Sequence, residues 1–238
     1  MKYAEDFRRI ARLSLKGKWA LAVAVGLVAS ILGGIGESYF NIEFNTTTAN
    51  GLLTRFTAID SKLFAILSSA IFVIALIALA MGIAYFILSS FIAVGYAKFN
   101  LDLVDNKEAG FNSLFDYYRY WKTTAISRLL RAVYIFLWTL ILFIPGIIAT
   151  YSYAMTDYIL AENPTMSPTE AINKSKEIMY GNRWRLFCLE FSFIGWAILA
   201  VLTCNIGTLW LTPYRSAAKA AFYREVSGTE CFIYADPV

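Results

Sequence analysis

One uninterrupted apolar segment sets the class of fold that is open to this chain. Residues 63–97 contain no Asp, Glu, Lys or Arg. As a single helix they would be about 50 Å long, whereas about 20 apolar residues already span the ~30 Å hydrocarbon core of a bilayer. Only 16% of the 238 residues are charged, against about 25% in soluble proteins. The sequence therefore predicts an all-α integral membrane protein, with a single membrane domain over residues 1–238.

The basic residues predict the direction in which each apolar segment crosses. If residues 63–97 cross once, all but two of the 21 Lys and Arg residues fall on one side of the membrane. If the segment broke at Gly82 into two crossings, the basic residues of 98–131 would lie opposite those of 1–18. The positive-inside rule favours the single crossing. A bundle of about six spans with both termini in the cytoplasm follows, at residues 19–36, 63–97, 129–144, 147–161, 186–203 and 206–226.

Amphipathic helices are expected to lie on the inner surface between these spans. Residues 1–18 carry six Lys and Arg beside an apolar helical face, which is typical of a helix on an anionic inner leaflet. Two more surface helices are predicted at residues 111–124 and 167–181, the second beginning with a capping box at Ser167. Membrane lipids are therefore expected partners, and nucleic acid is not.

Turn signals predict where the helices end. Pro145-Gly146 is predicted to form an outer turn, and residues 37–62 the sizeable outer loop. Gly228 is expected to stop the last helix. In residues 19–36, Ala22 and Gly26 belong to a stripe of small residues that predicts a packing seam inside the bundle, with a homo-oligomer contact as the alternative.

The inner connections resemble one another, which raises the possibility of an internal repeat. Asp105-Asn106 matches Glu162-Asn163 at an offset of 57 (162 − 105), and a third, shorter copy would begin at Pro213-Tyr214. Shared membrane composition also produces such matches, so duplication and chance remain open alternatives.

The chemistry available to the chain is narrow because it contains no histidine. This excludes Ser-His and Cys-His triads, imidazole acid–base catalysis and His-ligated metal sites. No phosphate-binding, nucleophile-elbow or metalloprotease motif occurs. We therefore predict a protein that is not an enzyme and needs no cofactor or metal.

Polar residues at membrane depth are the remaining candidates for a site. Glu190 lies about one turn inside its predicted span, with Arg131 or Arg185 as the expected partner. Glu190 could couple transport to a proton or cation, but a structural ion pair near the interface is the favoured interpretation. Asp157 and Tyr153, with neighbouring tyrosines, could line a cleft for a headgroup or substrate, or could be interfacial anchors.

Several short stretches resemble a bacterial integral membrane family, the domain of unknown function 975. They include Phe143-Ile144-Pro145-Gly146-Ile147, Tyr158-Ile159-Leu160-Ala161-Glu162-Asn163-Pro164, Glu170-Ala171-Ile172, Trp184-Arg185-Leu186-Phe187, Ser192-Phe193-Ile194-Gly195-Trp196 and Ala221-Phe222-Tyr223. The resemblance covers roughly residues 129–226. It implies a multi-pass protein of the plasma membrane of Gram-positive bacteria, without an assigned reaction. The chain is more distantly similar to the membrane domain of some glycerophosphodiester phosphodiesterases, whose catalytic barrel it lacks.

Three function classes follow from these features. The favoured one is a non-enzymatic membrane module that binds lipid, a small amphiphile or a partner protein, such as a transporter accessory. The alternative is a small permease coupled through Glu190. A membrane enzyme would require Glu190 and Asp157 to share a pocket that water can enter.

Overall fold

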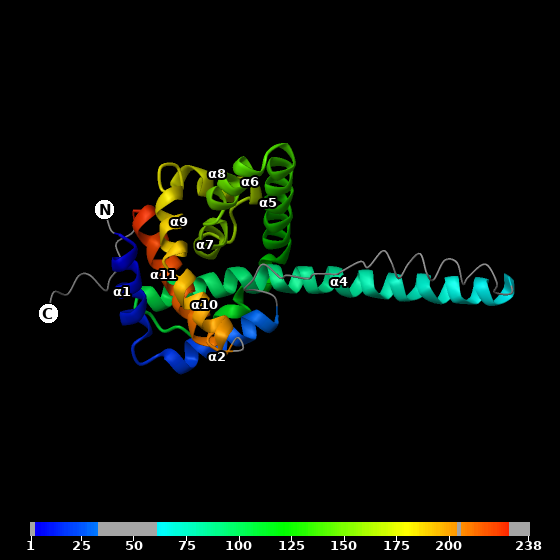
Figure 1. The fold of residues 1–238 in the computed structure, drawn as a ribbon, viewed down its shortest axis with the longest axis horizontal. Coiled ribbons are helices and arrows are strands. Elements are labelled where there is room, and N and C mark those ends of the chain that lie inside the picture. The colour runs from blue at the N-terminus through cyan, green and yellow to red at the C-terminus, as the bar shows by residue number, and fades with distance from the viewer. Residues whose placement is uncertain (1–2, 33–60, 204–205, 229–238) are drawn as a thin grey trace. The chain divides into compact units, whose positions relative to one another are not determined.

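The computed structural model describes residues 3–32, 61–203 and 206–228, and every regular element in these ranges is helical (Figure 1). This confirms the predicted all-α class. The elements are α1 (Ala4–Leu15), α2 (Trp19–Ile31), α4 (Ser61–Val104), the 3-10 helices η1 (Phe111–Leu114) and η2 (Asp116–Tyr120), α5 (Trp121–Ile141), α6 (Phe143–Ser152), α7 (Thr156–Glu162), α8 (Pro168–Ile178), α9 (Arg183–Phe191), α10 (Ile194–Leu202) and α11 (Thr208–Val226). The chain divides into two compact units, one of Met1–Ile35 with Ile87–Val238 and one of Gly36–Phe86.

The long apolar segment forms one helix, α4, which continues through Gly82 without a break. This confirms the prediction of a single helix rather than two short ones. Within the smaller unit, every side chain of residues 68–85 is exposed, although almost all are apolar. A helix that is apolar all round is typical of a segment surrounded by lipid or by other helices. The expected outer loop at residues 37–62 lies outside the described residues except for its last two, which begin α4.

The C-terminal part of α4 belongs to the larger unit and contributes to its core. Phe91, Ile92, Phe99 and Leu103 are each at most 6% exposed and belong to one hydrophobic cluster with buried residues of α1, α2, α7 and α11. The residues of α4 within the larger unit are therefore part of its core.

Three helical stretches in the described part of the chain are long and apolar enough to cross a membrane. They are Ser68–Val104, Phe111–Ile141 and Arg183–Leu202. A fourth arises if Ala4–Leu15 and Trp19–Ser30 count as one broken span, although these two helices meet at an angle of 103°. These features indicate a membrane protein. By length and composition alone, however, they account for three or four of the six expected spans.

The turn between α5 and α6, which was predicted to lie on the outer side, comes three residues before its predicted position. Ile141 ends α5, and Leu142 adopts an extended conformation (φ −157°, ψ 141°) from which α6 starts at once. The prediction of a turn at Pro145-Gly146 is therefore wrong. Pro145 is the third residue of α6, where a missing N–H costs little because the first amides of a helix have no partner within it.

Gly146 lets α5 and α6 pack closely. A Cβ atom at this position would lie 2.9 Å from Cα of Thr139 on the facing helix. The hairpin of α10 and α11 repeats this arrangement, because a Cβ atom at Gly207 would lie 2.9 Å from Cα of Ala200. Each glycine therefore allows two antiparallel helices to approach until their backbones nearly touch.

The fourth expected span, at residues 147–161, is broken in the structure. α6 ends at Ser152 and α7 begins at Thr156. The completely buried Ser175 of α8 fills the break, since its hydroxyl donates to the carbonyl of Ser152 (2.9 Å) and accepts from the amide of Met155 (3.2 Å). One side chain thus satisfies backbone groups that the interrupted helix leaves free.

Replacing Ser175 by alanine should lower the free energy of unfolding by about 1–2 kcal/mol, because the amide of Met155 would be left buried without its partner. The loss should appear as a lower midpoint when the purified protein is unfolded by sodium dodecyl sulfate in mixed micelles. Ser30→Ala, at an exposed position of α2, is the matched control and should leave the midpoint almost unchanged. Equal midpoints for the two variants would contradict the role given to Ser175.

Of the two predicted surface helices, only the second forms as an α-helix. α8 begins as expected, with the Ser167 hydroxyl accepting from the amide of Glu170 and a proline at the first helical position. Residues 111–124 instead form η1, η2 and the start of α5, so the prediction of one α-helix there is wrong. Of the apolar side chains expected to share one face in that stretch, Leu114 is buried and Tyr118 is exposed.

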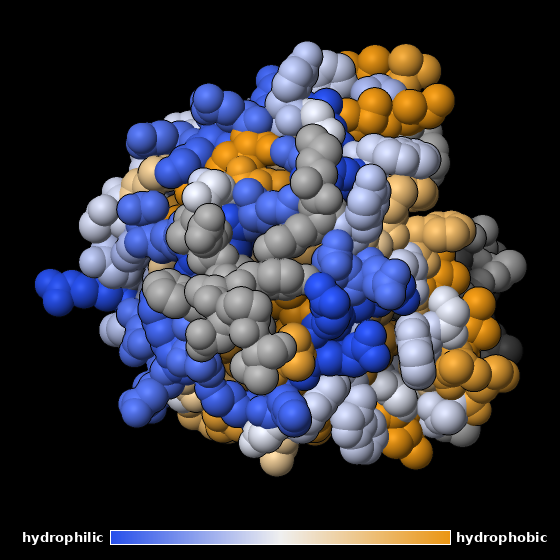
Figure 2. All heavy atoms as spheres, turned by 90° about the vertical axis from the view of Figure 1, so that its left-hand side faces the viewer, coloured by the Kyte–Doolittle hydropathy of each residue, from blue (hydrophilic) through white to orange (hydrophobic). Residues whose placement is uncertain are grey.

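The apolar face of the basic amino-terminal segment packs inside the protein. Phe7, Ile10 and Leu15 of α1 are at most 1% exposed, and the Phe7 ring meets the ring of Phe222 on α11 edge to face at 5.3 Å. Hydrophilic residues gather on the side of the molecule that carries α1, while hydrophobic residues lie mainly toward the right-hand edge of this view (Figure 2). The face expected to enter the bilayer surface is therefore packed against α11, and the exposed side of α1 is mostly charged.

Predictions for single residues of α2 and for the end of α11 can also be compared with the structure. Two small residues of the predicted stripe in α2 face inward, and Gly26 is buried near the ring hydroxyl of Tyr96 and the Cδ atom of Pro213. Ala22 is also completely buried, which agrees with a seam inside the bundle. Gly228 has a positive φ of 76° directly after the cap of α11, as expected for a helix stop.

Candidate functional site

The structure places Arg131 against Asp157 rather than against Glu190. Arg131 on α5 forms a two-pronged ion pair with Asp157 on α7, with Nη1–Oδ2 and Nη2–Oδ1 distances of 3.1 Å. Such paired contacts hold a carboxylate in a fixed orientation. Arg131 was predicted as the first candidate partner of Glu190, and that prediction is wrong.

Tyr153 lies near this ion pair but faces a small apolar cluster. Its side chain is buried, and its ring packs against that of Tyr134 on α5 at 6.2 Å. Tyr158 is likewise buried and stacks on Tyr223 of α11 at 5.5 Å. These tyrosines therefore pack helices against one another, and they do not line an open cleft with Asp157.

Arg185, the second candidate partner of Glu190, also forms its ion pair with a different residue. Its Nη2 atom lies 2.7 Å from Oε1 of Glu225 near the end of α11. The guanidinium also lies over the ring of Phe222 at 5.7 Å. This pairing ties the start of α9 to the end of α11 and leaves Glu190 to other cations.

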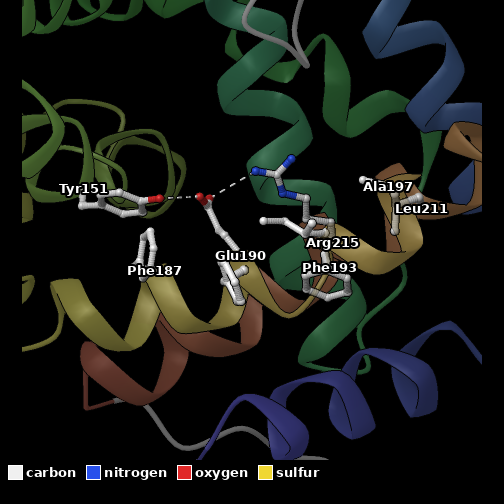
Figure 3. A pocket seen from close by; sticks show the side chains of 9 residues that line it. Tyr151, Phe187, Glu190, Phe193, Ala197, Leu211 and Arg215 are labelled. Atoms are coloured by element: carbon white, nitrogen blue, oxygen red, sulfur yellow. Dashed lines mark hydrogen bonds and ion pairs between the residues drawn. The ribbon is translucent and has the colours of Figure 1, made fainter. Parts of the chain in front are cut away.

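Glu190 is held by two cations of α11. Its Oε1 atom lies 2.5 Å from Nζ of Lys219 and 3.4 Å from Nη2 of Arg215. Its other oxygen, Oε2, accepts a hydrogen bond of 3.1 Å from the hydroxyl of Tyr151 on α6 (Figure 3). The structural ion pair expected for Glu190 is therefore present, with partners that differ from those predicted.

The two cations carry more charge than Glu190 neutralises. Lys219 makes the shorter contact and its side chain is 28% exposed, whereas the side chain of Arg215 is 49% exposed. One carboxylate between an ammonium and a guanidinium gives this group a formal charge of +1. Arg215 is the cation nearer to solvent and the one with the weaker hold on Glu190.

A pocket of about 250 Å³ opens beside this charged group. Its walls come from α6, α9, α10 and α11, and most of its lining is apolar. The lining residues are Tyr151, Phe187, Glu190, Phe191, Phe193, Ile194, Ala197, Leu211 and Arg215. Glu190 and Arg215 face each other at one part of the pocket, while Ala197 and Leu211 lie together beyond Arg215 (Figure 3).

Aromatic rings line one wall of the pocket. Phe187 stacks against Trp184 at 4.9 Å and against Phe191 at 5.9 Å along one face of α9, and it meets Tyr151 edge to face at 5.9 Å. The pocket therefore combines a rigid apolar wall with a few converging polar groups. This composition is typical of small-molecule binding sites in proteins.

A second charged cluster is buried where α4, α7 and α11 end. Arg224 is 5% exposed and its guanidinium binds Asp105 through two hydrogen bonds of 2.6 and 2.9 Å. It also binds Glu162, which accepts a hydrogen bond from the hydroxyl of Tyr223 at 2.5 Å. Lys107 adds a contact of 3.3 Å to Asp105. The cluster links three helix ends and adjoins no described pocket, so it holds the bundle together.

The sequence contained signals for some residues that our prediction missed. Arg215 and Lys219 are four positions apart, so they share one face of a helix and can converge on one carboxylate. Asp105 and Glu162 occupy matching positions in the proposed repeat, a signal that was not used to predict a common role. No sequence signal indicated that Arg224 would bridge these two residues.

The two predicted carboxylates, Asp157 and Glu190, have separate partners in the described part of the chain. No group of three or more Cys, Asp or Glu side chains in residues 3–32, 61–203 and 206–228 is arranged to hold a metal ion. Asp157 and Glu190 each pair with their own arginine or lysine and do not share a pocket. The arrangement expected of a membrane enzyme with two cooperating carboxylates is therefore not formed by these residues.

Comparison with known proteins agrees with part of the expected resemblance. Residues 129–230 match the model of the family described as "Protein of unknown function (DUF975)". The match covers the α5–α11 region and less than half of the chain. No curated protein and no solved structure matches the chain. These findings therefore support the first resemblance and do not extend to the glycerophosphodiester phosphodiesterases.

Proposed function

We propose that the chain is a multi-pass protein of the bacterial cell membrane, with six crossings and both termini in the cytoplasm. The stretches that carry α4, α5 and α9–α10 are long and apolar enough to cross. The close hairpins at Gly146 and Gly207 would then return the chain to the side from which it came. The hydrophilic side that carries α1 would face the cytoplasm, in agreement with the positive-inside rule (Figure 2).

Its function in the membrane is to bind a lipid or another small amphiphile without catalysing a reaction. The observation that carries this proposal is the pocket between α6, α9, α10 and α11, where apolar walls meet the charged group of Glu190, Lys219 and Arg215. An amphiphile has the same division into an apolar and a polar part. The pocket therefore suits such a ligand better than a polar solute.

The same geometry favours this function over that of a permease coupled through Glu190. A coupling carboxylate has to gain and lose a proton or cation during transport. Glu190 is instead fixed by Lys219, Arg215 and the hydroxyl of Tyr151. A carboxylate with three such partners is stabilised in its charged form, which suits a structural role.

Filling the pocket tests the proposal. Ala197→Phe places a ring in the apolar part of the pocket without changing charge, and we expect it to weaken binding of lysophosphatidylglycerol at least tenfold. Native mass spectrometry of the purified chain in a non-ionic detergent measures this affinity. Ala78→Phe, on the exposed part of α4 outside the pocket, is the matched control and should bind as the unchanged protein does. Equal affinities for the two variants would refute the pocket as the binding site.

A further inference from the structure

We infer that the pocket selects an amphiphile with one anionic headgroup, which Arg215 binds, and a single acyl chain, which lies along α10. This inference rests on the proposed function and gives the chemical class of its ligand. It follows from the charge balance of the site, from the position of Arg215 and from the size of the pocket.

The charge balance favours an anion over a zwitterion or a cation. Lys219, at 2.5 Å, is sufficient to neutralise Glu190, so the charge of Arg215 is left in excess. Arg215 is also the more exposed of the two cations and lines the pocket, which Lys219 does not. A guanidinium binds phosphate and carboxylate groups through paired hydrogen bonds, so an anionic headgroup can replace the weak 3.4 Å contact with Glu190.

The arrangement of the lining residues gives the ligand a direction. The polar groups of Glu190 and Arg215 lie together, and Ala197 and Leu211 lie on the far side of Arg215 from Tyr151 (Figure 3). A headgroup at Arg215 would therefore direct its chain toward α10 and the first turn of α11. In the proposed topology this is the direction from the inner surface toward the middle of the membrane, which is also the orientation of an inner-leaflet lipid.

The size of the pocket limits how much of the ligand it can enclose. At about 250 Å³ it lies just below the roughly 300–1,000 Å³ that is usual for drug-sized ligands. This volume accommodates a small headgroup and part of one chain. A lipid with two chains would have to leave one of them outside, against the exposed apolar side chains of α10.

The test compares two ligands that differ in headgroup charge and share the same chain. Lysophosphatidylglycerol and lysophosphatidylcholine are titrated onto the purified full chain in a non-ionic detergent, and bound molecules are counted by native mass spectrometry. We expect about tenfold tighter binding of the anionic lipid. Both lipids offer a phosphate to Arg215, but the choline of the zwitterion is repelled by the excess positive charge of Lys219 and Arg215. Added salt should reduce the difference because it screens the charge of a half-exposed arginine.

Variants of Arg215 assign the preference to this residue. Arg215→Gln should remove the tenfold preference, and Arg215→Lys, which keeps the charge, should retain most of it. Arg119→Gln removes the same charge from the exposed η2 helix outside the pocket and should leave the preference intact. An unchanged preference in Arg215→Gln would overturn the inference. Two results on the unchanged protein would also overturn the inference, even if that variant does not fold. One is equal binding of the two lysolipids, and the other is a preference that added salt does not reduce.

Two further probes separate the sources of negative charge. Palmitate carries a carboxylate on one chain, and its binding at an affinity similar to that of lysophosphatidylglycerol would support a site for anionic single-chain amphiphiles in general. Inorganic phosphate has no chain, and competition by phosphate alone at millimolar concentration would contradict a site that needs the apolar wall. If both lysolipids bind equally and Ala197→Phe weakens both, the inference fails while the proposed function stands. If neither binds, both fail.

Discussion

Replacing Arg224 by methionine is expected to lower the free energy of unfolding by about 3–5 kcal/mol, which is the usual cost of removing one partner from a buried ion pair. Methionine fills much of the space of the arginine stem but leaves Asp105 without its buried counter-charge. Glu162 loses its arginine partner at the same time and keeps only the hydroxyl of Tyr223. Unfolding by sodium dodecyl sulfate in mixed micelles, followed by far-ultraviolet circular dichroism, measures the change.

Two further variants distinguish the loss of the ion pair from a general sensitivity to substitution. Arg119→Met makes the same change at an exposed position of η2 and should alter the free energy of unfolding by less than about 0.5 kcal/mol. Adding Asp105→Asn and Glu162→Gln to Arg224→Met should recover part of the stability, because no unpaired charge then stays buried. A loss in Arg224→Met no larger than in Arg119→Met would contradict the central role of this cluster.

The second large effect is expected at Gly95, where the backbone of α4 touches η1. A Cβ atom at this position would lie 2.6 Å from the carbonyl oxygens of Ser113 and Leu114 and 2.7 Å from Cα of Leu114. These are backbone atoms, so no side-chain rotation can relieve the overlap, and η1 would have to move away from α4. We therefore expect Gly95→Ala to lower the free energy of unfolding by about 3 kcal/mol, at the upper end for overpacking.

The same substitution elsewhere in α4 provides a matched control. At Gly82 an added Cβ atom would meet nothing within 4 Å. Alanine is favoured over glycine inside a helix by about 0.5–1 kcal/mol, so Gly82→Ala should stabilise the protein slightly. Opposite signs for Gly95→Ala and Gly82→Ala are expected in the same unfolding experiment. A loss of similar size at both positions would show that close packing against η1 is not the cause.

The features that the sequence predicted well depend on interactions within a few residues. Ser167 caps α8 through the amide of Glu170, three positions away, and Gly228 ends α11 with its own backbone conformation. The continuity of α4 followed from charge alone, because one crossing places nearly all basic residues on one side. None of these predictions required knowledge of which segments meet in three dimensions.

The features that the sequence did not predict depend on distant contacts. The break after Ser152 is stabilised by Ser175, which lies 23 positions further along the chain. Glu190 pairs with Lys219 rather than Arg131 because α11, and not α5, brings cations to this part of α9. In both cases the residue types did not indicate which partner each residue would have. The partners are determined by how the helices pack against one another.

The close hairpins bear on the question of an internal repeat. Gly207 follows Gly146 by 61 positions (207 − 146), and Ala200 follows Thr139 by the same 61 positions (200 − 139). A duplicated helical hairpin accounts for these correspondences, whereas shared apolar composition does not explain why the same contacts recur. Duplication is therefore the interpretation that we favour.

The position of Arg224 in the chain also determines when the bundle can close. A protein is synthesised from its amino terminus, so Asp105 and Glu162 leave the ribosome well before the guanidinium that binds them. The interval between α1 and its partner helix α11 is even longer, because Tyr214, whose hydroxyl donates to the carbonyl of Arg8, is synthesised 206 positions after it. Until then the apolar side of α1 has no partner on α11, and a membrane surface would suit such an amphipathic helix. Arrival of α11 would then transfer the apolar side of α1 from the membrane surface to the protein core.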